Sequence, residues 1–263
     1  MTEGKLNMKR VRNTLFWTAV MAGIFSLLWM AVNRKMNIGV KSLHVEIQSI
    51  GDDQRMISES EVIKQVEQFL GHKADSVKLK NIDVRALETF LNKDRRIEKA
   101  DVYFNSNEEL SVKIVQKKPV MRVIDKHNVS YYLDKEGSQI PAGINGAIRV
   151  QIVTGALGAY NPHFLEEKQS SKLKEVFEIV SFVQKDDFLN ALIEQVHVEE
   201  GTGEIIMVPK IGRERLVFGD SERMEDKFDK LKIFYREGLP RLGWSKYKTL
   251  NLKYTDQIAC TLR

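Results

Sequence analysis

The sequence predicts an α+β protein with a single N-terminal transmembrane helix and two further domains. Three observations lead to this fold class. Residues 14–32 form an uncharged and mostly apolar run. Residues 38–118 follow the order strand, helix, helix, strand, strand. Residues 119–263 combine short apolar strands with helices, which is the pattern of a mostly antiparallel β domain with flanking helices.

The run of residues 14–32 is long enough to cross a bilayer as a helix. At ~1.5 Å per residue it measures about 28 Å, close to the roughly 30 Å of bilayer hydrocarbon. Trp17 and Trp29 lie near its ends, where indole rings prefer the headgroup level. A cleaved signal peptide is the alternative, but its apolar core spans only ~7–15 residues and a small-x-small cleavage site normally follows it. No such site is evident here, so the sequence favours an uncleaved anchor.

The charges that flank the run give a weak preference for one orientation. The tail, residues 1–13, carries four basic residues and Glu3, for a net charge of +3. The opposite flank carries three basic residues and Glu46, for a net charge of +2. The basic residues are Lys5, Lys9, Arg10 and Arg12 in the tail, and Arg34, Lys35 and Lys41 beyond the run. The positive-inside rule then predicts a cytoplasmic tail and extracytoplasmic domains.

Composition argues against a nucleic-acid-binding protein and against a disulfide scaffold. The formal net charge is +5, but basic and acidic residues are interleaved and no basic block has aromatic spacing. The single cysteine, Cys260, cannot form an internal disulfide, so burial of a core must hold the domains together.

Residues 38–118 predict a three-stranded sheet with two helices on one face. Alternating apolar residues near the start indicate the first strand. Ser58 and Glu61 form a capping box that opens the first helix, and Asn81 or Asp83 caps the second. Two strands joined by a turn at residues 105–108 complete the segment as a hairpin.

Residues 119–263 predict a larger β domain. We expect helices at residues 162–184 and after Ser221 as N-cap, with a short helix or extended piece after residue 187. The expected strands are residues 121–124, 130–133, 149–153, 193–199, 204–208, 215–218 and 249–254.

These elements resemble the FtsQ/DivIB family of bacterial cell-division proteins, in which one anchor is followed by a POTRA domain and a β domain. The hairpin is the firmest local match: L-S-V-K-I-V-Q-K-K-P-V at residues 110–120 resembles the family pattern L-x-V-x-V-x-E-x-x-P-v. Weaker matches lie at residues 97–102, 132–137, 216–219 and 250–254. Three residues depart from the pattern: Gln116 and Asn251 replace acids, and Lys253 replaces an arginine.

The resemblance implies a domain plan and a location. Residues 38–118 would form a POTRA-like domain and residues 119–263 the family's β domain. The protein would cross the bacterial inner membrane once, with the tail, residues 1–13, in the cytoplasm and the domains in the periplasm. It would be enriched at the division septum and bind other division proteins of the FtsB and FtsL type.

The motifs that suggest catalysis are incomplete in this chain. The five histidines, His44, His72, His127, His163 and His197, have no ligand-like spacing. Ser171 and Lys174 match the S-x-x-K of penicillin-binding enzymes, but the accompanying S-D-N and K-T-G elements are missing. The glycines of residues 155–158 lack the strand-loop-helix context of a phosphate-binding loop. We therefore expect no catalytic, cofactor or metal site, no small-molecule substrate and no enzymatic activity.

A binding function by strand addition fits these features best. The final strand, at a sheet edge, would offer unpaired backbone groups to an extended partner segment. The candidate partner-binding residues are Tyr254, Thr255, Asp256, Gln257, Ile258, Ala259 and Cys260 on that strand, and Arg223, Lys227 and Lys230 on the preceding helix. The resemblance implies that FtsB-type and FtsL-type partners dock there. An exposed edge of the POTRA-like sheet is a second candidate surface.

Two other classes of protein remain open. A membrane-anchored cell-wall hydrolase or transferase would need a cleft that gathers carboxylates or a Ser-Lys pair. A POTRA-containing outer-membrane assembly factor would need a barrel of many ten-residue alternating strands, and residues 119–263 contain too few strands for one.

Overall fold

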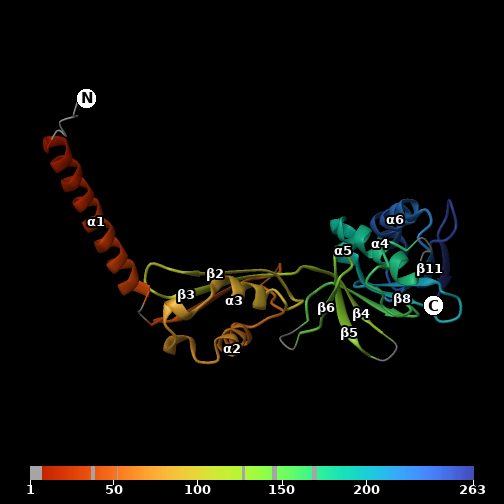
Figure 1. Ribbon diagram of the computed structural model, residues 1–263. Coiled ribbons are helices and arrows are strands. Elements are labelled where there is room, and N and C mark those ends of the chain that lie inside the picture. The colour runs from red at the N-terminus through yellow and green to blue at the C-terminus, as the bar shows by residue number, and fades with distance from the viewer. Residues whose placement is uncertain (1–7, 37–38, 52, 126–127, 144–146, 168–170) are drawn as a thin grey trace. The chain divides into compact units, whose positions relative to one another are not determined.

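The computed structural model describes residues 8–36, 39–51, 53–125, 128–143, 147–167 and 171–263 (Figure 1). The fold class is the predicted one: a mixed α+β protein with an N-terminal apolar helix and a large β-sheet. Two compact units divide the chain. The first unit takes the described residues up to Glu46 together with Glu59–Lys93 and Ala100–Ile114, and the second takes Ile47–Ser58, Asp94–Lys99 and Val115–Arg263.

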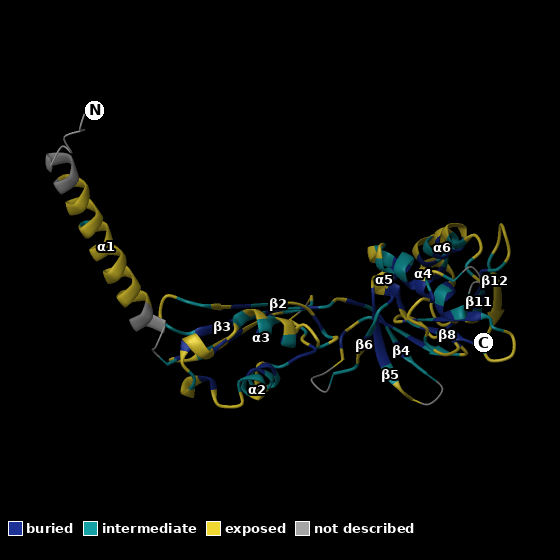
Figure 2. Ribbon diagram, viewed as in Figure 1, coloured by how far each residue is buried: buried dark blue, intermediate teal, exposed yellow. Residues whose placement is uncertain are grey.

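Helix α1 (Met8–Met36) contains the apolar run. Its stretch Asn13–Val32 has a mean hydropathy of 2.0 and no buried residue (Figure 2). Among the described residues it is the one helix long and apolar enough to cross a membrane. The Thr18 hydroxyl donates to the Leu15 carbonyl at 2.9 Å, so this polar group has a partner inside its own helix. The helix therefore fits a single-pass span.

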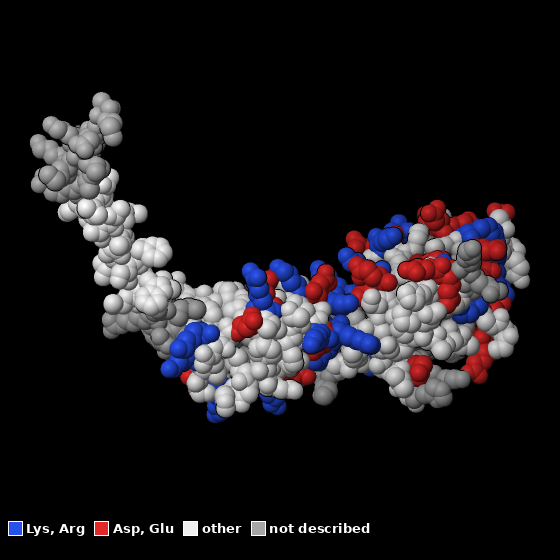
Figure 3. Space-filling view, in the orientation of Figure 1, with Lys and Arg blue, Asp and Glu red and all other residues white. Residues whose placement is uncertain are grey.

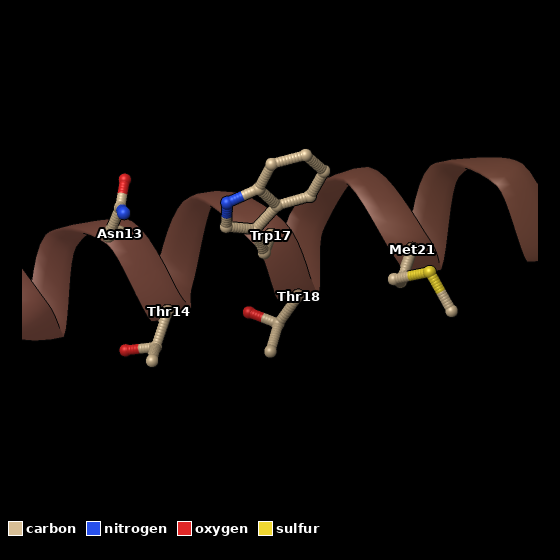
Figure 4. Close-up of a pocket in the computed structure, with 5 residues that line it drawn as sticks. All are labelled: Asn13, Thr14, Trp17, Thr18 and Met21. Atoms are coloured by element: carbon tan, nitrogen blue, oxygen red, sulfur yellow. The ribbon is translucent and has the colours of Figure 1, made fainter.

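A shallow groove on α1 is part of the surface of this one helix. Figure 4 shows its five lining side chains, which all come from α1: Asn13, Thr14, Trp17, Thr18 and Met21. Because no second element contributes, the groove is the space between neighbouring side chains of an exposed helix and holds no built site.

The first unit has the predicted strand and helix order. Its sheet has the strand order β1-β3-β2, and of the two predicted caps of α3 it is Asp83 that accepts from the Ala86 N–H, at 3.0 Å. Asn105 closes the predicted hairpin turn by accepting from the backbone N–H of Asn107 and Glu109. The elements are β1 (Leu43–Gln48), α2 (Glu59–Leu70), the 3₁₀ turns η1 (Ala74–Ser76) and η2 (Leu79–Asn81), α3 (Val84–Leu91), β2 (Ile97–Phe104) and β3 (Leu110–Gln116).

The second unit is built on a nine-stranded sheet with the order β12-β11-β10-β9-β8-β7-β4-β5-β6. Most neighbouring strands are antiparallel, but β4 with β7, β7 with β8, and β10 with β11 are parallel. The strands are β4 (Pro119–Ile124), β5 (Ser130–Asp134), β6 (Gln139–Pro141), β7 (Gln151–Gly155), β8 (Ile193–Val198), β9 (Ile205–Pro209), β10 (Arg215–Gly219), β11 (Tyr247–Asn251) and β12 (Ala259–Leu262).

Helices gather on one side of this sheet and enclose the main core (Figure 1). They are α4 (Lys172–Gln184), α5 (Asp187–Leu192), α6 (Met224–Ile233), the π-helical turn η3 (Phe234–Gly238) and α7 (Leu239–Leu242). Phe228 of α6 is fully buried and packs against Phe182 of α4 and Phe218 of β10, with ring centroids 5.3 and 4.8 Å away. The aromatic contacts therefore fix α6 to both α4 and the sheet.

Two predicted helix starts are wrong. The helix expected from residue 162 begins at Lys172, because Phe164 instead leaves the helical register and packs into the core as a loop residue. Ser171 is its N-cap and accepts from the Lys174 N–H, which gives this S-x-x-K match a structural role. The last long helix begins after Arg223, since the backbone N–H of Ser221 donates to Glu175 instead of starting a helix.

The predicted final strand is also different. It ends at Asn251, and a further short strand, β12, returns antiparallel to β11. Residues 252–258 connect the two strands, so of the predicted strand candidates only Ala259 and Cys260 lie on a strand. The buried side of β11 continues past the strand end only as far as Leu252, whose N–H still donates to the Val217 carbonyl; Tyr254, predicted on the same face, is exposed.

Candidate partner-binding edge

Strand β12 forms one edge of the large sheet, and its outer side is open. It pairs with β11 alone among the described strands, and all four of its residues are exposed. The Arg263 N–H donates inward to the Lys246 carbonyl. Backbone N–H and C=O groups of successive residues point to opposite sides of a strand, so those of Cys260 and Leu262 point outward. Leu262 is 57% exposed, and residues 259–262 carry no charge that would repel an incoming strand.

Two other sheet edges are protected. The opposite edge strand, β6, has only three residues and ends in Pro141, which has no N–H to offer. In the first unit, the side chains of Asn92 and Glu88 accept from the N–H groups of Ala100 and Val102 on β2, each at 2.9 Å. These two side chains occupy the donors that a partner strand would need, so the β2 edge is a poor docking site.

Two basic residues of the predicted set join α6 to the connection between β11 and β12. Arg223 donates to the Thr255 hydroxyl at 2.8 Å and to the Lys253 carbonyl at 2.9 Å. Lys230 donates to the Thr255 carbonyl at 2.7 Å and to the Tyr254 carbonyl. The structure thus brings four predicted residues together, and the two cations hold the connection in place.

A groove of about 280 Å³ lies beside this junction. Three predicted residues, Asp256, Gln257 and Ile258, line one part of it. The rest comes from the end of α6 and from η3: Lys230, Ile233, Phe234, Glu237 and Gly238. The sequence analysis missed Ile233, which is 59% exposed. Its signal was an apolar side chain outside the inward-facing stripe of the helix, and the π-helical turn that follows it has no recognisable sequence pattern.

Lys227 has a different role from the one that the sequence predicts. Its side chain is only 2% exposed and lies over the Phe218 ring, with Nζ 4.9 Å from the centroid. Nζ donates to the Asp220 carbonyl at 2.9 Å and to Asp220 Oδ1 at 2.7 Å. The ammonium is therefore used inside the fold, where it fixes the loop that leads into α6.

The Asp220 carboxylate is expected to stabilise the protein only above about pH 4. Burial raises its pKa, but the hydrogen bond and charge of Lys227 outweigh this effect, so the pKa lies below its usual value of 3.8. A lowered folded-state pKa gives a contribution that is complete above the unfolded-state pKa of about 3.9 and is lost as the pH falls through the folded-state value. Asp220→Asn should therefore lower the urea midpoint at pH 7 but much less at pH 3. Glu200→Gln is the control, because it removes one negative charge from an exposed turn. An equal effect of Asp220→Asn at both pH values would contradict the pairing of Asp220 with Lys227.

Lys253 replaces the arginine of the family pattern and is also paired. Its Nζ lies 2.5 Å from Glu204 Oε1, and this hydrogen bond raises the pKa of Lys253. A Cβ added to Gly219 would lie 2.8 Å from Cγ and Cδ of Lys253. Glycine at position 219 therefore leaves room for the Lys253 side chain. The ion pair joins the end of β11 to the start of β9.

The described surface gives no sign of a metal site or of a broad field of one charge. Among the described residues no group of three His, Cys, Asp or Glu side chains is placed to hold a metal ion. Basic and acidic side chains are interspersed over the face that Figure 3 shows. This pattern matches the mixed surface that the sequence indicates.

Comparison with protein families gives a match over the second unit. The profile described as "FtsQ/DivIB, C-terminal related" matches residues 118–261, which is more than half of the chain and includes α6, the connection, and most of β12. The comparison with curated proteins finds no match.

Proposed function

Because the chain belongs to the FtsQ/DivIB family of cell-division proteins, we propose that it is a non-enzymatic scaffold that recruits other division proteins. An extended segment of an FtsB-type partner adds to the open side of β12, and an FtsL-type partner joins the same complex. The observation that carries this proposal is the open, uncharged edge of β12, whereas the β6 edge is short and the β2 edge is capped by side chains.

The groove beside α6 supplies the second part of the proposed surface. Strand addition alone gives few contacts, because β12 has only four residues. Apolar side chains of the partner would bury against Ile233 and Ile258, while Tyr254, 50% exposed, offers an aromatic anchor. Arg223 and Lys230 act by holding the connection that carries Tyr254 and Thr255.

The membrane anchor makes modest contacts sufficient. A division-protein family and one candidate span fit a single-pass membrane protein. In the proposed arrangement the span lies in the bacterial inner membrane, residues 1–13 are cytoplasmic, and domains of residues 38–118 and 119–263 face the periplasm at the septum. Partners confined to the same membrane meet at a raised effective concentration, so several weak contacts sum to a stable assembly.

Partner capture should weaken when this surface is changed. We expect Tyr254→Ala and Ile233→Glu each to reduce recovery of the partner by roughly tenfold or more, the loss typical of a central interface residue. Tyr103→Ala and Ile211→Glu are matched controls, since these side chains are 49% and 61% exposed and neither lines the groove, while Ile233 is 59% exposed. The measurement is co-purification from membranes with full-length protein, together with in-cell crosslinking from photoreactive residues at positions 247–260. Wild-type recovery by both surface variants, with unchanged circular dichroism, would disprove the assignment.

A further inference from the structure

A pocket of about 460 Å³ lies where β7 and β8 begin, and we call it the β7–β8 pocket. This volume is within the usual range for small-molecule sites. Its charged side chains are Arg122, Arg149, Lys210 and Glu194. The remaining lining is Ala147, Ile148, Val150, Gln151, Ile152, Asn190 and Ile193. Three cations thus meet one carboxylate above a partly apolar lining.

Two of the three cations, Arg122 and Lys210, are anchored by contacts that leave their charges available. Arg122 Nε donates to the Ser130 hydroxyl at 2.7 Å, and its guanidinium carbon lies 5.7 Å from the centre of the Tyr132 ring. These contacts orient the guanidinium and leave its terminal amino groups for a ligand. The backbone N–H of Lys210 donates to the Leu192 carbonyl at 2.7 Å, and its Nζ lies 3.3 Å from the Asn190 carbonyl.

The base of the pocket is rigid. Gln151 is 3% exposed, and its amide donates to Asn190 Oδ1 at 2.8 Å and to the Ile193 carbonyl at 3.3 Å. Its carbonyl oxygen accepts from Gln184 at 3.3 Å. Ile148 and Ile193 are buried beside it. Because these buried polar groups are satisfied within the protein, the pocket is formed before any ligand arrives.

We propose that the β7–β8 pocket binds a short acidic peptide with a free amino terminus. The guanidinium and ammonium groups receive its carboxylates, for which the arginine fork is well suited, and Glu194 receives its ammonium. The excess of two positive charges calls for a ligand of net negative charge. An isolated phosphate would satisfy the cations but would face repulsion from Glu194.

Strand spacing sets the length of the ligand. Arg122 belongs to β4 and Glu194 to β8, with β7 between them in the sheet. Two strand separations amount to about 10 Å. Three extended residues span about 10 Å, so a tripeptide reaches from Glu194 to the cations. This proposal is independent of partner capture at β12.

The test uses full-length protein in nanodiscs and three probes: the tripeptide Ala-Ala-Glu, its N-acetylated form and inorganic phosphate. Acetylation removes the ammonium and is expected to weaken binding roughly fivefold, the upper range for an exposed ion pair. Glu194→Gln should remove this difference between the two peptides. Arg122→Gln should weaken both peptides, whereas Lys135→Gln, which removes an exposed charge elsewhere, should change neither. Isothermal titration calorimetry, or the change in NMR chemical shifts on titration, measures each affinity.

Three results would overturn the proposal. Equal affinity for the free and acetylated peptides would show that Glu194 receives no ammonium. Tighter binding of phosphate than of Ala-Ala-Glu would identify the pocket as a simple anion site. Absence of binding at millimolar peptide would remove the ligand class altogether. The Glu194→Gln and Arg122→Gln variants should still recover division partners normally, which keeps this test separate from that of β12.

Discussion

Replacing Gly155 by alanine is expected to destabilise the second unit by more than about 4 kcal/mol, an exceptionally large effect for one methyl group. Gly155 ends β7 with φ = +98° and pairs with Val198 of β8. A Cβ there would lie 2.0 Å from the Val198 carbonyl oxygen and 2.9 Å from its nitrogen. These are backbone atoms of β8 at the last pair of the β7–β8 ladder, so they cannot move aside without breaking that pairing.

Gly158 provides the matched control for this prediction. It also has a positive φ, +79°, but no atom lies within 4 Å of the position of an added Cβ. Gly158→Ala should therefore cost about 1 kcal/mol, from backbone strain alone. Urea unfolding of both variants, followed by circular dichroism, measures the contrast. Similar midpoints for the two alanine variants would mean that the close approach at Gly155 is not the source of the effect.

Replacing Gln116 by leucine is expected to lower stability by about 3 kcal/mol. Gln116 is 2% exposed, and its Oε1 accepts from the N–H groups of Met56 at 2.7 Å and Ile57 at 3.1 Å. Its Nε2 donates to the Gln48 carbonyl at 2.8 Å. Leucine fills similar space but leaves these three backbone groups without their partner, and each buried unsatisfied group costs about 1–3 kcal/mol. Urea midpoints measure the loss, with Gln68→Leu on the exposed face of α2 as control.

The Gln116→Glu variant separates the accepting and donating roles of the amide. A carboxylate still accepts from Met56 and Ile57, but it faces the Gln48 carbonyl with no proton to donate. A protonated carboxyl group can donate again. The variant should therefore be clearly less stable than the wild type at pH 7 and closer to it at pH 4. A variant as stable as the wild type at pH 7 would show that the donated bond contributes little. The family pattern has an acid at this position. The bond that the Gln116 amide donates to the Gln48 carbonyl gives a structural reason for glutamine in this chain.

Elements with strong periodicity were predictable from the sequence, whereas short or irregular elements were not. The hairpin of β2 and β3 followed from alternation, and local capping chemistry limited the cap of α3 to Asn81 or Asp83, of which Asp83 is the observed one. Strands β6 and β12 have three and four residues, too few for an alternating pattern to stand out. Their positions depend on partners distant in the chain.

For the candidate partner-binding residues, the sequence predicted part of their placement in the fold but not the contacts that each side chain makes. Ala259 and Cys260 do lie on the edge strand, and Arg223 and Lys230 do contact the preceding connection. From the sequence, Lys227 cannot be distinguished from an exposed lysine of the same helix. Nothing in the neighbouring sequence shows that Asp220 and Phe218 enclose it. Tertiary packing decides such cases, since a long side chain can be directed either to solvent or to a buried acceptor.

The parallel strand pairs have a consequence for the order of folding. They join residues far apart in sequence: Met121 with Gln151, Ile152 with Gln195, and Leu216 with Leu250. Such non-local pairing raises the contact order, so we expect refolding in milliseconds to seconds rather than microseconds. Strand β12 pairs with β11, and β11 in turn needs β10. The proposed partner-binding edge is thus expected to assemble late, and a partly folded molecule would have no finished edge to extend.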